Sequence, residues 1–193
     1  MKTNSSRYNL GFKRKRDGVT DYRKRLKILM SKKPRLVIRR SLKHMQASLV
    51  EFTPKGDIVK ITAHSSQLKK LGWKYDTGNM PSAYLVGYIA GKKALKIGIK
   101  EAILDLGLQK AAKGSRLFAV LAGALEAGLQ VPHGEEVIPK KERLTGTHIK
   151  KYAETFKDNK EGLTKQFGSC IKNDAKPEQI SAEVEKIKAS IGK

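Results

Sequence analysis

A dense run of basic side chains lies near the start of this 193-residue chain. Between Phe12 and Leu26, seven of fifteen residues are lysine or arginine and two are acidic. A folded core cannot bury so many unpaired charges, because each charged group would lose its hydration. The chemistry open to these side chains is therefore contact with water or with a polyanion. A solvated, disordered arm is the simpler alternative for a basic run.

Aromatic rings among these cations favour RNA as the polyanion. Tyr8, Phe12 and Tyr22 are interleaved with the basic residues, as expected where bases or sugars stack between phosphate contacts. From Thr20 the run follows a helical pattern, with Thr20 as the cap and Asp21 in the first turn. We therefore expect an arm that is flexible to about residue 19, turns at a glycine and continues as a short helix.

The charge of the whole chain is concentrated in this arm. The formal net charge is +23. Residues 1–43 contain 16 basic and 2 acidic residues, residues 44–133 contain 12 basic and 6 acidic residues, and residues 134–193 contain 13 basic and 10 acidic residues. A surface adapted to salt or heat would mix both signs along the chain, whereas this gradient indicates an anionic partner at the N-terminal end. No apolar run approaches 18 residues, and polar residues follow Met1. We expect a cytosolic protein without a membrane segment.

Residues that could perform catalysis are few and scattered. His44, His64, His133 and His148 stand far apart without a metal-ligand spacing, and Cys170, the single cysteine, has no acid–base partner nearby. We therefore predict no metal site, no cofactor and no small-molecule substrate. The carboxylates of the middle region are Glu51, Asp57, Asp76, Glu101, Asp105 and Glu126. We expect single amide replacements of Asp57, Asp76, Glu101 or Asp105 to leave RNA binding intact, because no catalytic partner is evident.

The elements that must position the basic residues begin with three strands. Residues 36–40, 47–52 and 58–63 are rich in β-branched and apolar residues, and the turn sequence of residues 53–57 joins the last two. The pattern predicts a three-stranded antiparallel meander. Arg39 and Arg40 are adjacent in the first strand, so they must point to opposite faces of the sheet.

Two helices and a fourth strand complete the predicted domain. We expect a loop over residues 64–80 that contains Trp73, then a helix opened by Asn79 and Pro81. A strand over residues 101–106 joins the sheet by a crossover, and Ser115 caps a second helix. Glycines inside the first of these helices indicate that another element approaches it closely.

The chain therefore divides into three parts. Residues 1–33 form the basic arm with its short helix, and residues 34–133 form a mixed α/β (α+β) core of meander, crossover strand and two packing helices. Residues 134–193 form an α-helical C-terminal extension, because apolar residues recur at helical spacing in three successive segments.

Four stretches together resemble a known ribosomal family. They are the segment Lys15–Tyr22, the helix pair around Gly87 and Gly123, the segment Gly128–His133 and the C-terminal segment Lys165–Asn173. Their combination is similar to the large-subunit ribosomal protein that binds 5S ribosomal RNA, which is number eighteen in bacterial and archaeal naming and number five in eukaryotic naming. The helical tail and the shortened segments around it resemble the archaeal type.

The resemblance implies a βαβα domain whose basic arm grips 5S rRNA in the central protuberance of the large subunit. It also implies contacts with the large-subunit rRNA and with neighbouring ribosomal proteins, in the cytoplasm. We therefore expect a structural constituent of the ribosome and no enzyme. The alternatives are an RNA-processing enzyme of the metal-dependent nuclease type and, third, an interaction scaffold without RNA.

The residues expected to contact RNA are cations and rings of the arm, followed by polar residues of the first strand and the connection after it. The cations would contact phosphates, and the rings would stack or pack against sugars. The set is Arg7, Tyr8, Phe12, Lys13, Arg14, Lys15, Arg16, Tyr22, Arg23, Lys24, Arg25, Arg39, Arg40, Lys43 and His44.

Overall fold

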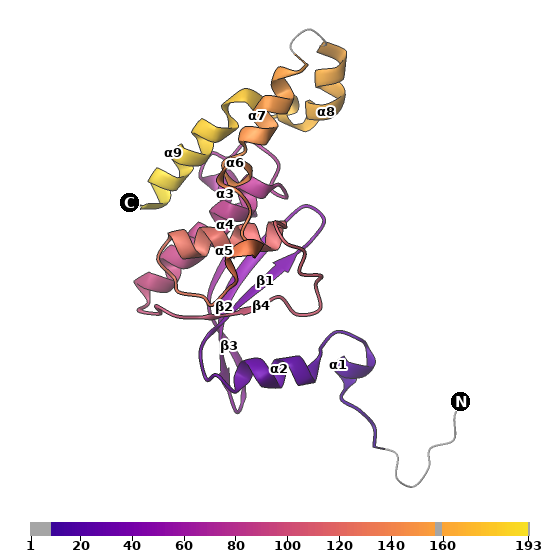
Figure 1. The fold of residues 1–193 in the computed structure, drawn as a ribbon, viewed down its shortest axis with the longest axis vertical. Coiled ribbons are helices and arrows are strands. Elements are labelled where there is room, and N and C mark those ends of the chain that lie inside the picture. The colour runs from indigo at the N-terminus through magenta and orange to yellow at the C-terminus, as the bar shows by residue number, and fades with distance from the viewer. Residues whose placement is uncertain (1–8, 157–159, 193) are drawn as a thin grey trace, which may run out of the picture.

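The protein is elongated, with a sheet and its covering helices in the middle, the basic arm at one end and a helical extension at the other (Figure 1). The structure is a computed structural model that describes residues 9–156 and 160–192. Within these residues, no helix is both long enough and apolar enough to cross a membrane.

The sheet has four strands in the order β3-β2-β1-β4. The strands are β1 (Arg35–Arg40), β2 (Met45–Thr53), β3 (Gly56–His64) and β4 (Ile103–Asp105). Strands β1, β2 and β3 pair antiparallel, and β4 pairs parallel to β1. The predicted mixed α/β class, with its meander and crossover strand, is confirmed.

Two helices cover one face of the sheet. They are α4 (Met80–Lys96), capped by Asn79, whose Oδ1 accepts from the Ser82 backbone N–H at 2.9 Å, and α5 (Arg116–Glu126). A Cβ atom on Gly87 would come within 1.8 Å of the Val120 carbonyl oxygen, and one on Gly123 within 2.0 Å of the Tyr84 carbonyl oxygen. The two helices therefore cross backbone against backbone, as the glycines inside the first helix led us to expect.

The N-terminal segment is more ordered than predicted. Residues expected to be flexible form α1 (Lys13–Arg16), and after the turn at Gly18, whose φ is +64°, the chain continues as α2 (Tyr22–Leu29). The predicted cap, Thr20, was wrong by one residue. Asp21 caps α2, because its carboxylate accepts two backbone N–H groups at 3.0 and 3.1 Å and suits the positive end of the helix better than a hydroxyl does.

Two further expectations about local structure need correction. The predicted loop at residues 64–80 contains the short helix α3 (Ser66–Lys70). Trp73 of this loop lies in the core, as is usual for its residue type, and its Nε1–H is donated to the Asp76 carbonyl. Ser115 does occupy the N-cap position of α5, but its buried Oγ makes no capping hydrogen bond.

The three amphipathic segments of the C-terminal extension form α7 (Thr147–Glu154), α8 (Lys160–Lys172) and α9 (Ile180–Gly192). Short helical segments connect them. The 3-10 helix η1 (Glu135–Val137) and the helix α6 (Lys141–Leu144) lie between the core and α7, and the 3-10 helix η2 (Pro177–Gln179) lies between α8 and α9. Ile180, Val184 and Ile187 of α9 are buried in the same apolar cluster as α4. The extension is therefore packed onto the core.

Candidate nucleic-acid interface

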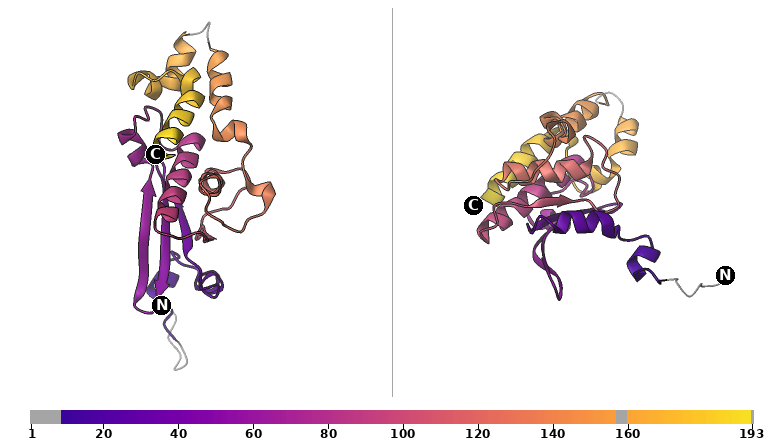
Figure 2. Two further views of the ribbon diagram at one scale, coloured as in Figure 1. Left: turned by 90° about the vertical axis from the view of Figure 1, so that its left-hand side faces the viewer. Right: turned by 60° about the horizontal axis from the view of Figure 1, so that its bottom comes forward.

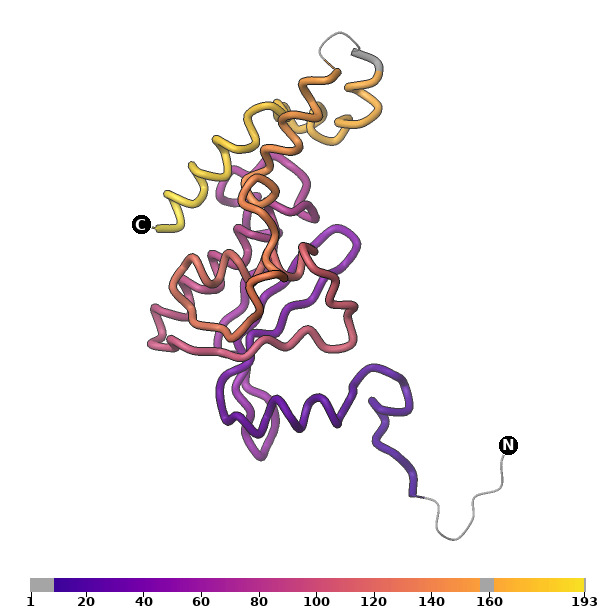
Figure 3. The backbone as a smooth tube through the Cα atoms, viewed as in Figure 1, coloured from indigo at the N-terminus to yellow at the C-terminus, as the bar shows by residue number. Residues whose placement is uncertain are grey.

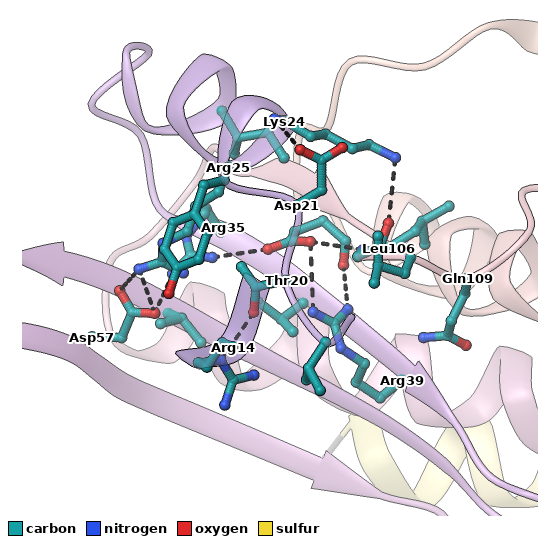
Figure 4. A pocket seen from close by; sticks show the side chains of 18 of the residues that line it. Arg14, Thr20, Asp21, Lys24, Arg25, Arg35, Arg39, Asp57, Leu106 and Gln109 are labelled. Atoms are coloured by element: carbon teal, nitrogen blue, oxygen red, sulfur yellow. Dashed lines mark hydrogen bonds and ion pairs between the residues drawn. The ribbon is translucent and has the colours of Figure 1, made fainter. Parts of the chain in front are cut away.

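Helix α2 lies against the face of the sheet that α4 and α5 leave uncovered (Figure 2). Side chains alternate along β1, so Leu36 and Ile38 are buried under the helices. Arg35, Val37 and Arg39 point to the opposite face. Between that face, α2 and the loop after β4 is a cavity of about 820 Å³ (Figure 4).

Ion pairs arranged around the buried Arg35 hold the two walls of this cavity together. Arg35 is 3% exposed and its guanidinium lies 2.8 Å from Asp105 Oδ2 and 2.7 Å from Asp57 Oδ2. Arg25 of α2 donates to the other oxygen of Asp57 at 2.8 Å. Asp57 therefore connects an arginine of the arm to an arginine of the sheet.

The ionisation of Asp57 reflects these contacts. Burial alone would raise the pKa of its carboxyl, but hydrogen bonds and charge from Arg25 and Arg35 outweigh burial and lower the pKa below its ordinary value of 3.8. The hydrogen bond to Asp57 also raises the pKa of Arg25. Both groups are therefore charged across the physiological range, which keeps α2 attached to the sheet.

The rim of the cavity is cationic and held by the loop after β4. Lys24 Nζ donates to the Gly107 carbonyl at 3.3 Å, and Arg39 Nη1 donates to the Asp105 carbonyl at 2.9 Å. Gly107 has a φ of +61°, and a Cβ there would lie 3.0 Å from the Arg39 guanidinium. Arg14 of α1 closes the rim and donates from Nε to Thr20 Oγ1 at 2.9 Å.

The structure brings one group of the predicted RNA-contacting residues together. The members that line the cavity are Arg14, Tyr22, Lys24, Arg25 and Arg39. Phe12 packs against Tyr22, with ring centroids 5.0 Å apart. The other predicted cations of α1 and α2 are exposed beside the cavity and are Lys13, Lys15, Arg16 and Arg23. Arg7 and Tyr8 lie outside the described residues.

A second group lies at the other end of β1. Arg40 pairs in register with Met45, whose side chain is buried under the helices, so Arg39 and Arg40 point to opposite faces as predicted. His44 Nδ1 lies 3.0 Å from Ser65 Oγ, and the Lys43 carbonyl accepts from Thr77 Oγ1 at 2.8 Å. These residues form a separate surface, away from the cavity.

Sequence reasoning missed Arg35 as a site residue, and it did not foresee that Asp57 and Asp105, for which no catalytic partner is evident, pair with arginines. Asp57 and Asp105 are the partners of Arg35, so their replacement would leave a buried arginine without compensation. The alternation Arg35, Val37, Arg39 was the available signal, since it places two arginines on one face. Carboxylates engaged by arginine differ from the convergent set that a metal-dependent nuclease needs, and the described side chains contain no metal-binding group of three or more His, Cys, Asp or Glu.

Comparison with known proteins places the whole chain in one family. The family model described as "Ribosomal large subunit proteins 60S L5, and 50S L18" matches residues 6–102 and 98–134. The large ribosomal subunit protein uL18 of the archaeon Methanococcus maripaludis is 46% identical over 187 residues, which cover 97% of each chain. These matches include the arm, the cavity and the helical extension, and they agree with the expected archaeal type. The chain therefore belongs to the L5 and L18 family of large-subunit ribosomal proteins.

Proposed function

We propose that this protein binds 5S rRNA in the large ribosomal subunit, in the cytoplasm, and attaches it to the central protuberance. The observation that carries the proposal is a basic arm fixed in one direction on the open face of the sheet, in a chain that belongs to this ribosomal family. An arm used only for solubility would not need an ion pair such as Arg25–Asp57, backed by the buried Arg35, to orient its helix.

Neutralisation of phosphates supplies most of the affinity in this proposal. Lys13, Lys15, Arg16 and Arg23 are exposed and form no ion pair among the described residues, so each can approach a phosphate. Every such contact releases condensed counterions from the RNA. Phosphate contacts position the protein, and the fixed direction of α2 then lets it discriminate the shape of one folded RNA from another.

The remaining surfaces have partners of other kinds. Arg40, Lys43 and His44 at the far end of β1 would contact the large-subunit rRNA. The C-terminal extension, at the opposite end of the molecule from the arm (Figure 3), would contact neighbouring ribosomal proteins. In this arrangement the protein joins 5S rRNA to the body of the subunit and performs no chemistry.

A binding comparison tests the proposal. Purified protein is titrated with transcribed 5S rRNA of the same organism and with a transfer RNA as a folded control of comparable size, at one salt concentration. We expect 5S rRNA to bind at least about tenfold more tightly, within the range of specificity that shape readout adds to phosphate contacts. Equal affinity for the two RNAs would overturn the proposal, and Mg²⁺-dependent cleavage of the RNA would favour the nuclease alternative.

A further inference from the structure

The cavity beneath α2 combines an apolar floor with a cationic rim. Val37, Val50 and Val59 of the sheet form the floor, and Tyr22 of α2 lies across from them. Arg14, Lys24 and Arg39 of the rim also line the cavity. The carboxylates in the lining are already engaged, because Asp21 caps α2 and Asp57 and Asp105 pair with Arg35. A volume of about 820 Å³ falls in the range of small-molecule sites. A ligand that fits must therefore present an apolar surface to the floor and negative charge to the rim.

One donor inside the cavity is unused. Arg35 lines the cavity, its side chain is 4% exposed, and its Nε–H has no hydrogen-bond partner among the described residues. Buried donors are almost always paired, and an unpaired one is destabilising. Because Nε itself is closed to solvent, a ligand in the cavity reaches this donor only after a small shift of the Arg35 side chain.

We propose that the cavity receives one unpaired nucleotide, with its base on the valine floor and its phosphate at the cationic rim. A small shift of Arg35 brings its Nε–H to an edge acceptor of the base, and Tyr22 packs against the base. A nucleobase has the flat apolar faces and the edge acceptors that this arrangement requires, and the adjoining phosphate matches Arg14 and Arg39. The inference rests on the proposed function for its RNA and extends it from phosphate contact to the capture of a single base.

A nucleotide with this chemistry could belong to the bound 5S rRNA or be free in solution. An extruded nucleotide of the RNA fits the position of the cavity, because α1 and α2 carry the exposed cations that would hold the flanking backbone. The experiment below separates the two sources.

Two neighbouring residues of β3 provide a matched pair of variants. Val59 lines the cavity and is 57% exposed, whereas Ile58 is 47% exposed and points to the other face of the strand. Val59→Trp would fill the cavity and Ile58→Trp would not, and neither changes the charge of the protein. Because both positions are exposed, each variant should fold, which a thermal unfolding curve would verify.

We expect Val59→Trp to weaken 5S rRNA binding at least about tenfold and to reduce the dependence of affinity on salt by no more than one phosphate contact, about 0.7–0.9 in slope, since the contacts of α1 and α2 with the flanking backbone remain. Ile58→Trp should bind within about twofold of wild type. With 2-aminopurine placed at single unpaired positions of the RNA, one position should change its fluorescence on binding wild type and Ile58→Trp, but not Val59→Trp.

Three results would decide against the inference or redirect it. If Val59→Trp binds 5S rRNA as wild type does while wild type still prefers 5S rRNA to transfer RNA, the cavity holds no nucleotide and the proposed function stands. If wild type shows no such preference, the proposed function itself fails. Adenosine or guanosine monophosphate bound by wild type and Ile58→Trp, but not by Val59→Trp, would support the nucleotide site and assign it to a free nucleotide.

Discussion

At the scale of single residues, the direction of the arm depends on Asp57. A purely electrostatic account predicts that loss of this carboxylate tightens RNA binding, because the protein becomes more positive. The geometry predicts the opposite, since Asp57 is the residue that joins Arg25 of α2 to Arg35 of the sheet.

We expect Asp57→Asn to weaken 5S rRNA binding several-fold and to lower the free energy of unfolding by about 1.5–3 kcal/mol, the range for hydrogen bonds to charged groups. Filter binding and urea unfolding would measure the two effects. Glu51→Gln is the matched control, because Glu51 is on the same hairpin and, among the residues that the structure describes, forms an ion pair only with the exposed Lys60. The control should bind no more weakly than wild type, and tighter binding by Asp57→Asn would show that charge alone governs the arm.

The lowered pKa of Asp57 also predicts how the arm responds to acid. A carboxyl whose pKa is lower in the folded state stabilises that state above its ordinary pKa of 3.8, and the contribution disappears as pH falls through the lower folded value. The attachment of α2 should therefore weaken below about pH 4. Backbone amide shifts of α2 followed by NMR through an acid titration would detect this step. The step should be missing in Asp57→Asn, and an identical titration of both proteins would contradict the prediction.

At the scale of elements, the crossing of α4 and α5 allows no side chain at its centre. Gly87→Ala would place a methyl group 1.8 Å from the Val120 carbonyl oxygen, which is backbone and cannot move aside. We expect a loss of about 3 kcal/mol or more, or failure to fold. Gly168→Ala in α8 meets no atom within 4 Å and should change stability by no more than about 1 kcal/mol. Thermal unfolding of the two variants gives the comparison, and equal stability would show that the helices can separate at little cost.

A lysine of the last helix adds charged contacts to the apolar packing of that helix on the core. Lys188 of α9 forms an ion pair with Glu126, which also accepts from the Tyr84 hydroxyl, and its Nζ lies 5.9 and 5.5 Å from the ring centroids of Tyr84 and Tyr88. Burial and the hydrogen bond to Glu126 raise the pKa of Tyr84 to about 12, so the hydroxyl stays protonated.

We expect Lys188→Met to destabilise the docking of α9 by about 1 kcal/mol, because it removes a partly exposed ion pair and the cation–π contacts while keeping the apolar stem. Faster amide hydrogen exchange confined to α9 would report the change. Lys186→Met is the control, since within residues 9–156 and 160–192 the ion pair of Lys186 is with Glu183 of its own helix. Equal protection of α9 in the two variants would contradict the assigned role.

The strands, the crossover and the two core helices were predictable, because apolar periodicity and turn residues are local signals. The cap of α2 was missed by one residue, since Thr20 and Asp21 are both good caps and the choice depends on Arg14, which uses the threonine hydroxyl. The charge cluster beneath the arm could not be predicted. Its partners Arg35 and Asp105 are 70 residues apart and meet only through the parallel pairing of β1 and β4.

At the scale of the whole molecule, charge and shape divide the protein into an arm for the anionic partner and a nearly balanced extension. We expect replacement of Lys13, Arg14, Lys15 and Arg16 by glutamine to reduce the slope of log affinity against log salt by about 0.7–0.9 for each phosphate that the variant no longer neutralises. The control replaces the exposed residues Lys150, Lys151, Lys165 and Lys172 of the C-terminal extension by glutamine, which removes the same amount of charge. An equal fall of the slope in both variants would mean that the position of the positive charge, in the arm or in the extension, does not affect RNA binding.

The parallel pairing of β4 with β1 also sets the order in which a nascent chain acquires the two features that we propose bind RNA, the basic arm and the cavity. The arm and α2 leave the synthesising ribosome first, so their basic residues are available before the core has been made. The loop at residues 105–109 completes the cavity wall. It can take its place only after α4 has been made and β4 has paired with β1, because contacts between strands so distant in sequence form late. An unfinished chain therefore attracts RNA by charge alone, and only a completed core offers the cavity beside it.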